Sequence, residues 1–225
     1  IGYWGDHQVV YLLRLLEAAQ ARDPALLPRL WDRAVFSFAD VPYRIRDHAQ
    51  RVADPKATID FDAPADARAR ERAQRVGSDG LMVCDADDQP VLGTLAEKLA
   101  TIVLAKAGNL VPGGGLWLNT QRPEWNDANN ALVGNGLSIV TLAHLRRFLH
   151  FVAALPCAGD AFDLPAATLQ ALQGLGELAR ALPTAADDAV ARRTFVDRAG
   201  ALLDTWRADA WRGAAPGGVR RVPVP

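Results

Sequence analysis

Cysteine is scarce in this chain of 225 residues, which contains only Cys84 and Cys157. The two are not spaced as a CxxC pair, and no cluster of histidines stands near either of them. Structural zinc sites and thiol redox motifs depend on such spacing, so neither is predicted, and no other cofactor is indicated. We expect the two cysteines to serve as small, partly buried apolar residues.

The chain also lacks an excess of charge of either sign, and it lacks long apolar runs. It has 25 Lys and Arg against 26 Asp and Glu, a formal net charge of −1. Nucleic-acid binders normally show a basic excess, so a nucleic-acid partner is not predicted. No stretch approaches the roughly 18 uninterrupted apolar residues of a membrane helix, so a membrane partner is not predicted either. With 50% hydrophobic and 23% charged residues, the composition is that of a folded globular domain.

The first residue is Ile1 rather than methionine, and the chain passes at once into the aromatic and polar cluster Tyr3-Trp4-Gly5-Asp6-His7. This start is typical of a piece cut from a longer protein, in which any targeting segment would be missing. The protein partners that we expect are therefore the rest of a parent chain or a second copy of this one.

Apolar residues recur at helical spacing near the start of the chain. Val9, Leu12, Leu13 and Leu16 predict a helix over about 7–21. Asp23 is a good N-cap and is followed by Pro24, which predicts a second helix over 24–37. Because the connection is short, we expect the two helices to form an antiparallel hairpin.

Further helices are predicted along the chain. Thr94 and Glu97 have the spacing of a capping box, which begins a helix that ends near Gly108. Two apolar stripes between 137 and 152 predict the longest helix of the chain, buried on most sides. The Ala- and Leu-rich C-terminal part predicts helices near 166–182 and 187–208.

Residues 43–90 show little helical periodicity. Within them, 63–77 has few large apolar residues, which predicts either a short exposed helix or a mobile loop with little burial. Leu81-Met82-Val83-Cys84 is consistent with one short strand. Since helices otherwise dominate, the predicted fold class is all-α, built from helical hairpins. We expect one helical domain over 1–212, followed by an extended tail over 213–225.

Two polar clusters that contain tryptophan interrupt the helical pattern, and each stands just before an apolar helix. The first is Trp4 with Asp6, His7 and Gln8, and the second is the run from Asn119 to Asn130. Loops on a rigid scaffold are where binding residues concentrate. Sugar sites need flat aromatic faces and planar polar groups, and glycosidic cleavage typically needs carboxyl groups on both sides of the bond. The candidates for sugar contact are Trp4, His7, Gln8, Arg122, Trp125, Asn126, Asn129 and Asn130, and the candidate carboxyls are Asp6, Glu124 and Asp127.

Structural roles are open for the same residues. Asp127 and Asp6 are each equally well suited to cap the helix that follows. Trp4 and Trp125 could anchor the core, and Arg122 could pair with Glu124. Among the histidines, His144 stands on an apolar stripe, which favours a place in the core, whereas His48 and His150 are predicted to lie on the surface.

The segment Thr120-Gln121-Arg122-Pro123-Glu124-Trp125-Asn126-Asp127 resembles the Trp-Asn-Asp motif of the six-hairpin (α/α)₆ glycosidase superfamily, in particular of cellobiose-phosphorylase-like proteins. The resemblance implies that Trp125 lines the sugar site and that Asp127 is the general acid of an inverting mechanism. The Tyr3-Trp4-Gly5-Asp6 cluster is similar to an aromatic-Trp-x-Asp element of the same proteins, which implies that Asp6 binds sugar hydroxyls. Residues 112–142 are also similar to a group of large bacterial proteins with such a domain.

This chain departs from the family pattern on both sides of the motif. Pro123-Glu124 stands where those phosphorylases usually have Gly-Asp, and Ala128-Asn129 stands where they have Gly-Met. A full barrel of that superfamily has twelve helices, about twice the number predicted here, so the resemblance implies a partial barrel.

Two classes of function follow. The first is a carbohydrate-active domain that cleaves glycosidic bonds with inversion, either by activated water or by inorganic phosphate as co-substrate. Arg122 and the amides of Gly113-Gly114-Gly115 are the candidates for holding phosphate. The second is a non-catalytic all-α module that binds sugar or acts as a scaffold in a larger enzyme. A helical-repeat interaction protein would require a repeat period, which the sequence does not show.

Overall fold

The computed structural model describes residues 6–119, 134–155, 162–182, 188–213 and 221–224. Of these residues about 60% are helical and 15% are in strands or bridges, so the fold is a mixture of α and β and the all-α prediction is wrong. The helices are α1 (Asp6–Arg22), α2 (Leu26–Leu30), α3 (His48–Ala53), α4 (Ala63–Val76), η1 (Ser78–Leu81), α5 (Leu95–Ala107), α7 (Ile139–Ala153), α8 (Ala166–Arg180) and α9 (Ala189–Gly213). The strands are β1 (Phe36–Ser37), β2 (Tyr43–Ile45), β3 (Ile59–Phe61), β4 (Leu92–Gly93), β5 (Leu110–Val111), β6 (Gly115–Trp117), β7 (Leu137–Ser138), β8 (Phe162–Pro165) and β9 (Arg221–Val224).

The strands form small antiparallel sheets, and the pairs β1–β4 and β8–β9 connect segments far apart in the chain. Strand β1 pairs with β4, β2 with β3, and β8 with β9, while β5, β6 and β7 form a three-stranded sheet. In the β8–β9 pair Phe162 faces Val224, and Pro165 faces Arg221. Each strand has only two to four residues, too few for an alternating pattern to stand out in the sequence. This is the physical reason why the sheets were not predicted.

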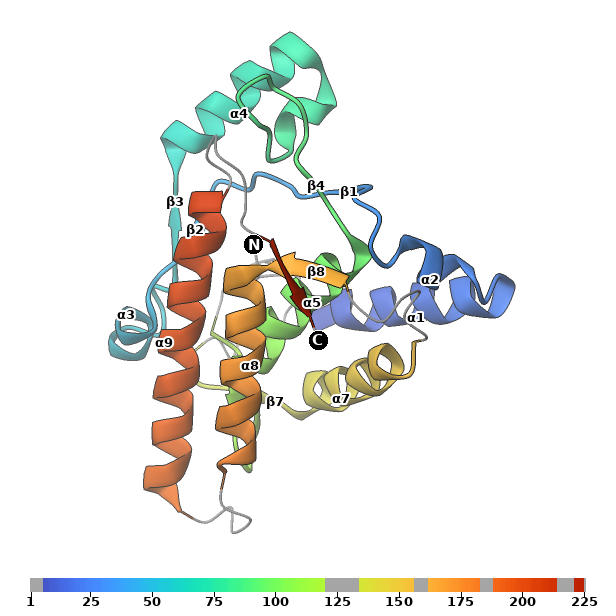
Figure 1. The fold of residues 1–225 in the computed structure, drawn as a ribbon. Coiled ribbons are helices and arrows are strands. Elements are labelled where there is room, and N and C mark those ends of the chain that lie inside the picture. Colours follow the sequence, from blue (N-terminus) through green and yellow to red (C-terminus); the bar gives the residue numbers. More distant parts are fainter. Residues whose placement is uncertain (1–5, 120–133, 156–161, 183–187, 214–220, 225) are drawn as a thin grey trace.

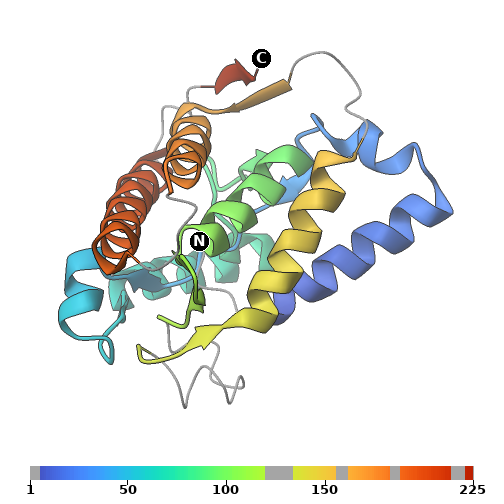
Figure 2. The ribbon, with the colours of Figure 1, turned by 90° about the horizontal axis from the view of Figure 1, so that it is seen from below.

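Helix α5 lies at the centre of the fold (Figure 2), between the α8–α9 pair on one side and α7 with α1 on the other. Thr94 caps its first turn as predicted, because its hydroxyl accepts from the Glu97 amide and the Glu97 carboxylate accepts from the Thr94 amide. Leu99 and Leu104 on this helix are almost completely buried. Residues of this helix therefore lie at the centre of the hydrophobic core.

The helices do not follow one another around a ring of hairpins. Helices α8 and α9 form an antiparallel hairpin (Figure 1), but α1 packs on α7, which follows it by more than a hundred residues. The predicted helix over 24–37 is reduced to the five residues of α2, since the chain then turns to pair β1 with β4, and the Val35 amide donates to Gly93 O. The expectation of a partial (α/α)₆ barrel is thus corrected together with the fold class.

Two expectations about individual helices were also wrong. The longest helix in the described part is α9, with 25 residues, against 15 for α7. Helix α7 is buried through Thr141, Leu145 and Phe148, whereas its apolar residues Ile139 and Val140 are 68% and 70% exposed. The helix is therefore not buried on most sides.

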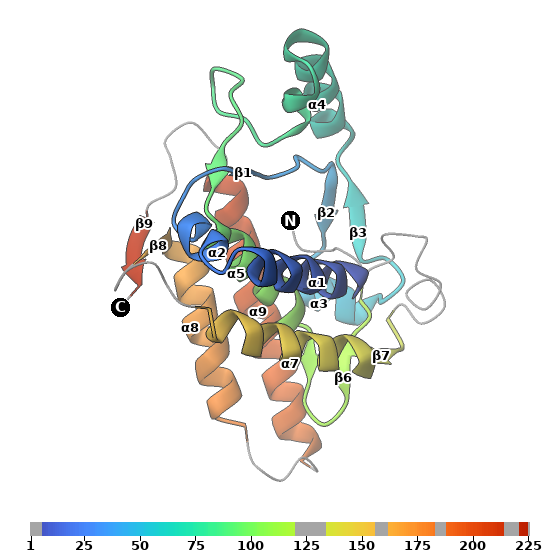
Figure 3. The same cartoon turned by 90° about the vertical axis from the view of Figure 1, so that its right-hand side faces the viewer.

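Helix α4 lies apart from the main body at one end of the molecule (Figure 3), where most of its residues are exposed. Of the two alternatives for this segment, the exposed helix is the one observed, with Ala65 and Ala69 as its buried residues. No helix in the described part of the chain is both long and apolar enough to cross a bilayer.

Candidate functional site

The residues predicted to contact sugar lie outside the part of the chain that the structure describes. Trp4, Arg122, Glu124, Trp125, Asn126, Asp127, Asn129 and Asn130 fall in undescribed segments. Asp6, His7 and Gln8 begin helix α1, but only their backbone is described. The predicted meeting of the two clusters, and the structural alternatives for these side chains, therefore stay predictions. The structure describes the residues on both sides of segment 120–133, up to Asn119 and from Gly134 onward.

The two ends of segment 120–133 are joined by backbone hydrogen bonds. The Gly134 amide donates to Leu118 O (2.6 Å), and the Leu118 amide donates to Gly136 O (3.0 Å). These bonds continue the antiparallel pairing of β6 with β7, in which Trp117 faces Leu137. The Trp117 indole N–H also donates to Gly134 O (3.2 Å). The segment that carries the Trp-Asn-Asp motif thus starts and ends at one fixed place on a sheet.

Gly134 is required at the returning end for two reasons. Its φ is +79°, in the left-handed region that favours glycine. A Cβ built on it would also stand 2.2 Å from Cβ of Pro55 and 2.7 Å from the Pro55 carbonyl oxygen. The backbone therefore passes directly over the chain that follows α3.

A chain of side-chain amides fixes the outgoing end. Asn119 is 3% exposed, and its Nδ2 donates to Oδ1 of Asn109 (2.8 Å). Asn109 in turn donates from its own Nδ2 to the carbonyl oxygen of Ala105, in the last turn of α5 (2.8 Å). Because buried amides need partners, this arrangement holds Asn119 against the central helix.

Two residues of helix α3 pack against Trp117. The guanidinium carbon of Arg51 lies 6.0 Å from the centroid of the Trp117 ring, at the outer limit of a cation–π contact. The His48 ring meets the same tryptophan edge to face, with 6.3 Å between ring centroids. Trp117 thus connects the ends of segment 120–133 to a polar cluster between α3 and α9.

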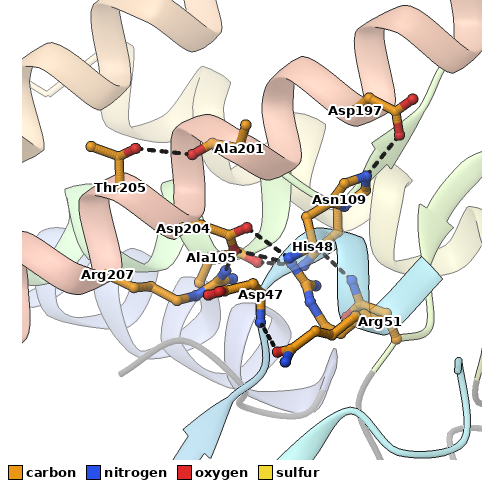
Figure 4. A network of polar contacts seen from close by, with 12 residues as sticks. Asp47, His48, Arg51, Ala105, Asn109, Asp197, Ala201, Asp204, Thr205 and Arg207 are labelled. Atoms are coloured by element: carbon orange, nitrogen blue, oxygen red, sulfur yellow. Dashed lines mark hydrogen bonds and ion pairs between the residues drawn. The ribbon is translucent and has the colours of Figure 1, made fainter. Parts of the chain in front are cut away.

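That cluster centres on Asp204 of α9 (Figure 4). One of its carboxylate oxygens accepts from the backbone amide of His48 (2.6 Å). The other lies 3.6 Å from a guanidinium nitrogen of Arg51 and 3.5 Å from one of Arg207. Asp204 therefore joins α3 to α9 and is the closest counter-charge for both arginines.

Both arginines are strongly buried, with 1% of Arg51 and 7% of Arg207 exposed. Their Nε atoms are buried, and neither has a hydrogen-bond partner among the residues that the structure describes. Burial lowers the pKa of Arg51, although Asp204 and Asp47 oppose the change. Burial lowers the pKa of Arg207 to about 9, and repulsion from Arg51 contributes to the lowering. The negative charges of Asp204 and Asp47 oppose it. In this cluster the two buried guanidinium groups share one partly buried carboxylate, Asp204, and the exposed Asp47 attracts both of them.

The His48 ring completes the cluster on the side away from Asp204. Its Nε2 is 2.9 Å from Oδ1 of Asp197, and Arg193 donates to the other oxygen of that carboxylate. Partial burial would raise the pKa of Asp197, but the hydrogen bonds from Arg193 and His48 hold it below its usual range. Both carboxylates that α9 presents here are thus already engaged, and the cluster acts as a support rather than as an acid or base.

Sequence reasoning missed this cluster and placed His48 on the surface, whereas it is 8% exposed. His150, by contrast, is exposed as predicted, and His144 is half-buried. A signal was present in α9, where Asp204 and Arg207 interrupt an apolar stretch that contains Leu203 and Trp206. Charged residues on the apolar face of a helix are typically buried in pairs.

The glycines Gly113-Gly114-Gly115, whose amides are the candidates for holding phosphate, lie at the turn of a β-hairpin. Gly113 has a φ of +74°, and the Gly114 amide donates to Val111 O, which closes the β5–β6 hairpin.

Among the described residues no group of three or more His, Cys, Asp or Glu is placed to hold a metal ion. No protein-family model matches this chain, and neither does any curated protein.

Proposed function

We propose that this chain acts on carbohydrate, with segment 120–133 supplying the residues that face the sugar. The observation that carries the proposal is the fixed double anchor of that segment at Leu118 and Gly134, beside the buried Asn119. Sugar-binding and catalytic side chains need to be held in place by a rigid support, and loops on such a support are where they concentrate. The Trp, Asn and Asp residues that the segment contains are of the kind a sugar site uses.

In this proposal Asp127 is the general acid and Trp125 the platform for the sugar ring. A carboxyl that donates a proton near neutral pH needs a raised pKa, which burial against an indole provides. The proton goes to the oxygen of the leaving group as the glycosidic bond breaks. Water or inorganic phosphate attacks the anomeric carbon from the opposite face, which gives inversion.

Activation of water requires a second carboxylate, at about 6.5–9.5 Å from the first in an inverting pair. Asp197 and Asp204 already neutralise arginines in the described cluster. Asp6 and Glu124 are therefore the candidates for the base. Phosphorolysis needs no protein base, and Arg122 is then the candidate for holding the phosphate.

The second candidate function is sugar binding without cleavage. It is favoured by the engagement of Asp197 and Asp204, each of which already pairs with an arginine. In that case Trp125 and the asparagines bind the sugar, and Asp127 caps the helix that follows it.

The test is Asp127→Asn, assayed on a panel of disaccharides with and without inorganic phosphate. Asparagine is almost isosteric and is an equally good helix cap, so stability should change by only a few tenths of a kcal/mol. Loss of proton donation should lower turnover by at least about 10²-fold while sugar affinity is kept. Asp87→Asn, on an exposed turn, is the matched control.

Turnover by Asp127→Asn at the parent rate would reject the catalytic role. If the parent protein binds sugars but cleaves none of them, the binding function replaces it. If it neither binds nor cleaves any of them, the proposal as a whole is wrong.

A further inference from the structure

A cavity of about 480 Å³ opens between helices α1 and α5 and is closed at one side by β1 and the residues that follow it. Val9 and Leu12 line it from α1, Leu99 and Ile102 from α5, and Phe36 and Phe38 from the third side. Its volume lies within the range of about 300–1,000 Å³ that is usual for small-molecule pockets. None of its described lining residues belongs to the proposed carbohydrate site.

The lining is almost entirely apolar. Apart from Thr101 and the lysines Lys98 and Lys106, every lining residue is aliphatic or aromatic. At the rim, Tyr11 is 68% exposed and Leu15 is 65% exposed. Large apolar side chains gathered at the mouth of an apolar cavity mark a binding site more often than a plain surface.

One cation in this lining is incompletely paired. Nζ of Lys98 donates one hydrogen bond, to the carbonyl oxygen of Ser37 (2.7 Å), and lies 4.1 Å from the centroid of the Phe38 ring. An ammonium group carries three donors, and among the described residues no carboxylate lies within ion-pair distance of this one. Its partial burial lowers the pKa of Lys98, in keeping with a charge that lacks a counter-ion.

We propose that this cavity binds a monocarboxylate with a long unbranched alkyl chain, its carboxylate on Nζ of Lys98 and its chain between α1 and α5. The choice follows from charge complementarity. One anionic group satisfies the spare donors of Lys98, and a purely apolar body matches the rest of the wall. A neutral apolar ligand would fill the cavity but would leave the Lys98 ammonium group without a counter-ion.

The proposal does not depend on the proposed function, since it is argued from described residues that have no part in the carbohydrate site. A buried ion pair between ammonium and carboxylate is a strong, charge-assisted contact. The alkyl chain contributes through the area that it removes from water. Each methylene is worth about 0.8 kcal/mol, or about a fourfold change in Kd.

The experiment is calorimetric titration of the whole chain with saturated carboxylates of six to twelve carbons, below their micelle concentrations. Each acid is compared with its methyl ester and with the corresponding alcohol. We expect Kd to fall about fourfold per added methylene until the cavity is filled, and the esters and alcohols to bind at least tenfold more weakly than the acids. This comparison uses the unaltered protein and needs no variant.

Lys98→Met keeps the length of the side chain but removes its charge, so it should abolish the difference between acid and ester. Lys56→Met, at an exposed lysine far from the cavity in sequence, should leave that difference unchanged. An unfolding curve for each variant separates loss of binding from loss of fold.

Equal affinity for acid and ester, or affinity that does not depend on chain length, would overturn the proposal. Sedimentation of the same samples adds a further check. A stable dimer that binds no carboxylate would show that the cavity is not open to this ligand, and this too would overturn the proposal.

Discussion

The imidazole of His48 packs directly against Gly200, in the middle of helix α9. A Cβ on Gly200 would stand 2.2 Å from both Cγ and Nδ1 of the ring. The close approach brings the His48 amide to Asp204 and the ring to Asp197, one turn of α9 on either side. The absence of a single side chain therefore decides how α3 lies on α9.

Gly200→Ala tests this relationship. Alanine is the better helix former, so in open space it would add about 0.5–1 kcal/mol of stability. The contact with His48 should reverse the sign and destabilise the protein by about 1–3 kcal/mol in urea unfolding. Gly176→Ala is the matched control, since its Cβ would meet only the end of the flexible Arg180 at 3.4 Å. Equal effects of the two substitutions would show that the His48 contact carries no energetic weight.

Removing a negative charge from the ionic cluster and removing a positive one should have different effects on the free energy of unfolding. Asp204→Asn leaves Arg51 and Arg207 buried without their closest counter-charge, so it should cost about 3–5 kcal/mol of unfolding free energy. Arg207→Met removes one buried charge and keeps the volume apolar, so it should be neutral or stabilising. Chemical denaturation of both variants at neutral pH provides the measurement. Comparable destabilisation by both would show that Asp204 needs Arg207 as much as the two arginines need Asp204.

The lowered pKa of Arg207, about 9, predicts a dependence of stability on pH. Below pH 9 the arginine is charged in both the folded and the unfolded chain, and the cost of burying that charge is fully present. Above pH 9 the folded chain binds fewer protons than the unfolded one, so the free energy of unfolding should rise with pH. Between pH 8 and 10 the rise should be about 1.4 kcal/mol relative to Arg207→Met. If the free energy of unfolding of the parent protein changes with pH in parallel with that of Arg207→Met, titration of Arg207 in this range is ruled out.

The half-buried Arg72 connects helix α4 to the segments beside it, which limits how freely the helix can move. Arg72 donates to the carbonyl oxygens of Gly80 and Met82, and it pairs with Asp40. Arg72→Met would leave these acceptors without their donor, at a cost of about 1–3 kcal/mol, and should raise hydrogen exchange through residues 63–76. Arg70→Met, at an exposed arginine that pairs only with Asp66, should leave exchange unchanged. Exchange already complete in the parent protein would show that Arg72 does not hold the helix.

Gly134→Ala tests the anchor of segment 120–133. The substitution combines an unfavourable positive φ with contact against Pro55, so it should destabilise more than either alone and lower any carbohydrate turnover. Gly77→Ala isolates the first effect, because Gly77 also has a positive φ but no atom within 4 Å of a Cβ. Its cost should be about 1–3 kcal/mol, without loss of turnover. The anchor is unimportant if the two variants behave alike in both measurements.

The helices could be predicted from the sequence where a local pattern and a capping residue agree. The Thr94–Glu97 box and the stripe from Val9 to Leu16 needed no knowledge of the rest of the chain. The β8–β9 pairing was beyond prediction, because residues 162–165 acquire strand geometry only from a partner about sixty residues away. The same holds for β1, which replaced the end of a predicted helix.

The candidate site divides in a similar way. The composition and the resemblance of segment 120–133 are local, so sequence reasoning found that segment. The support beneath it was missed because it joins Arg51 with residues about 150 positions later, and neither stretch looks unusual by itself. Charged residues at helical spacing are usually solvated, and only the fold shows that these are buried.

Helix α5 belongs to both clusters of buried apolar residues. Leu95 and Leu99 lie in one, with Val9 and Phe148, while Leu104 lies in the other, with α8 and α9. The two clusters thus meet along one helix of 13 residues, and neither can open while that helix keeps its place. We therefore expect the body of the molecule to unfold cooperatively, whereas α4, which contributes to neither cluster, is able to open independently.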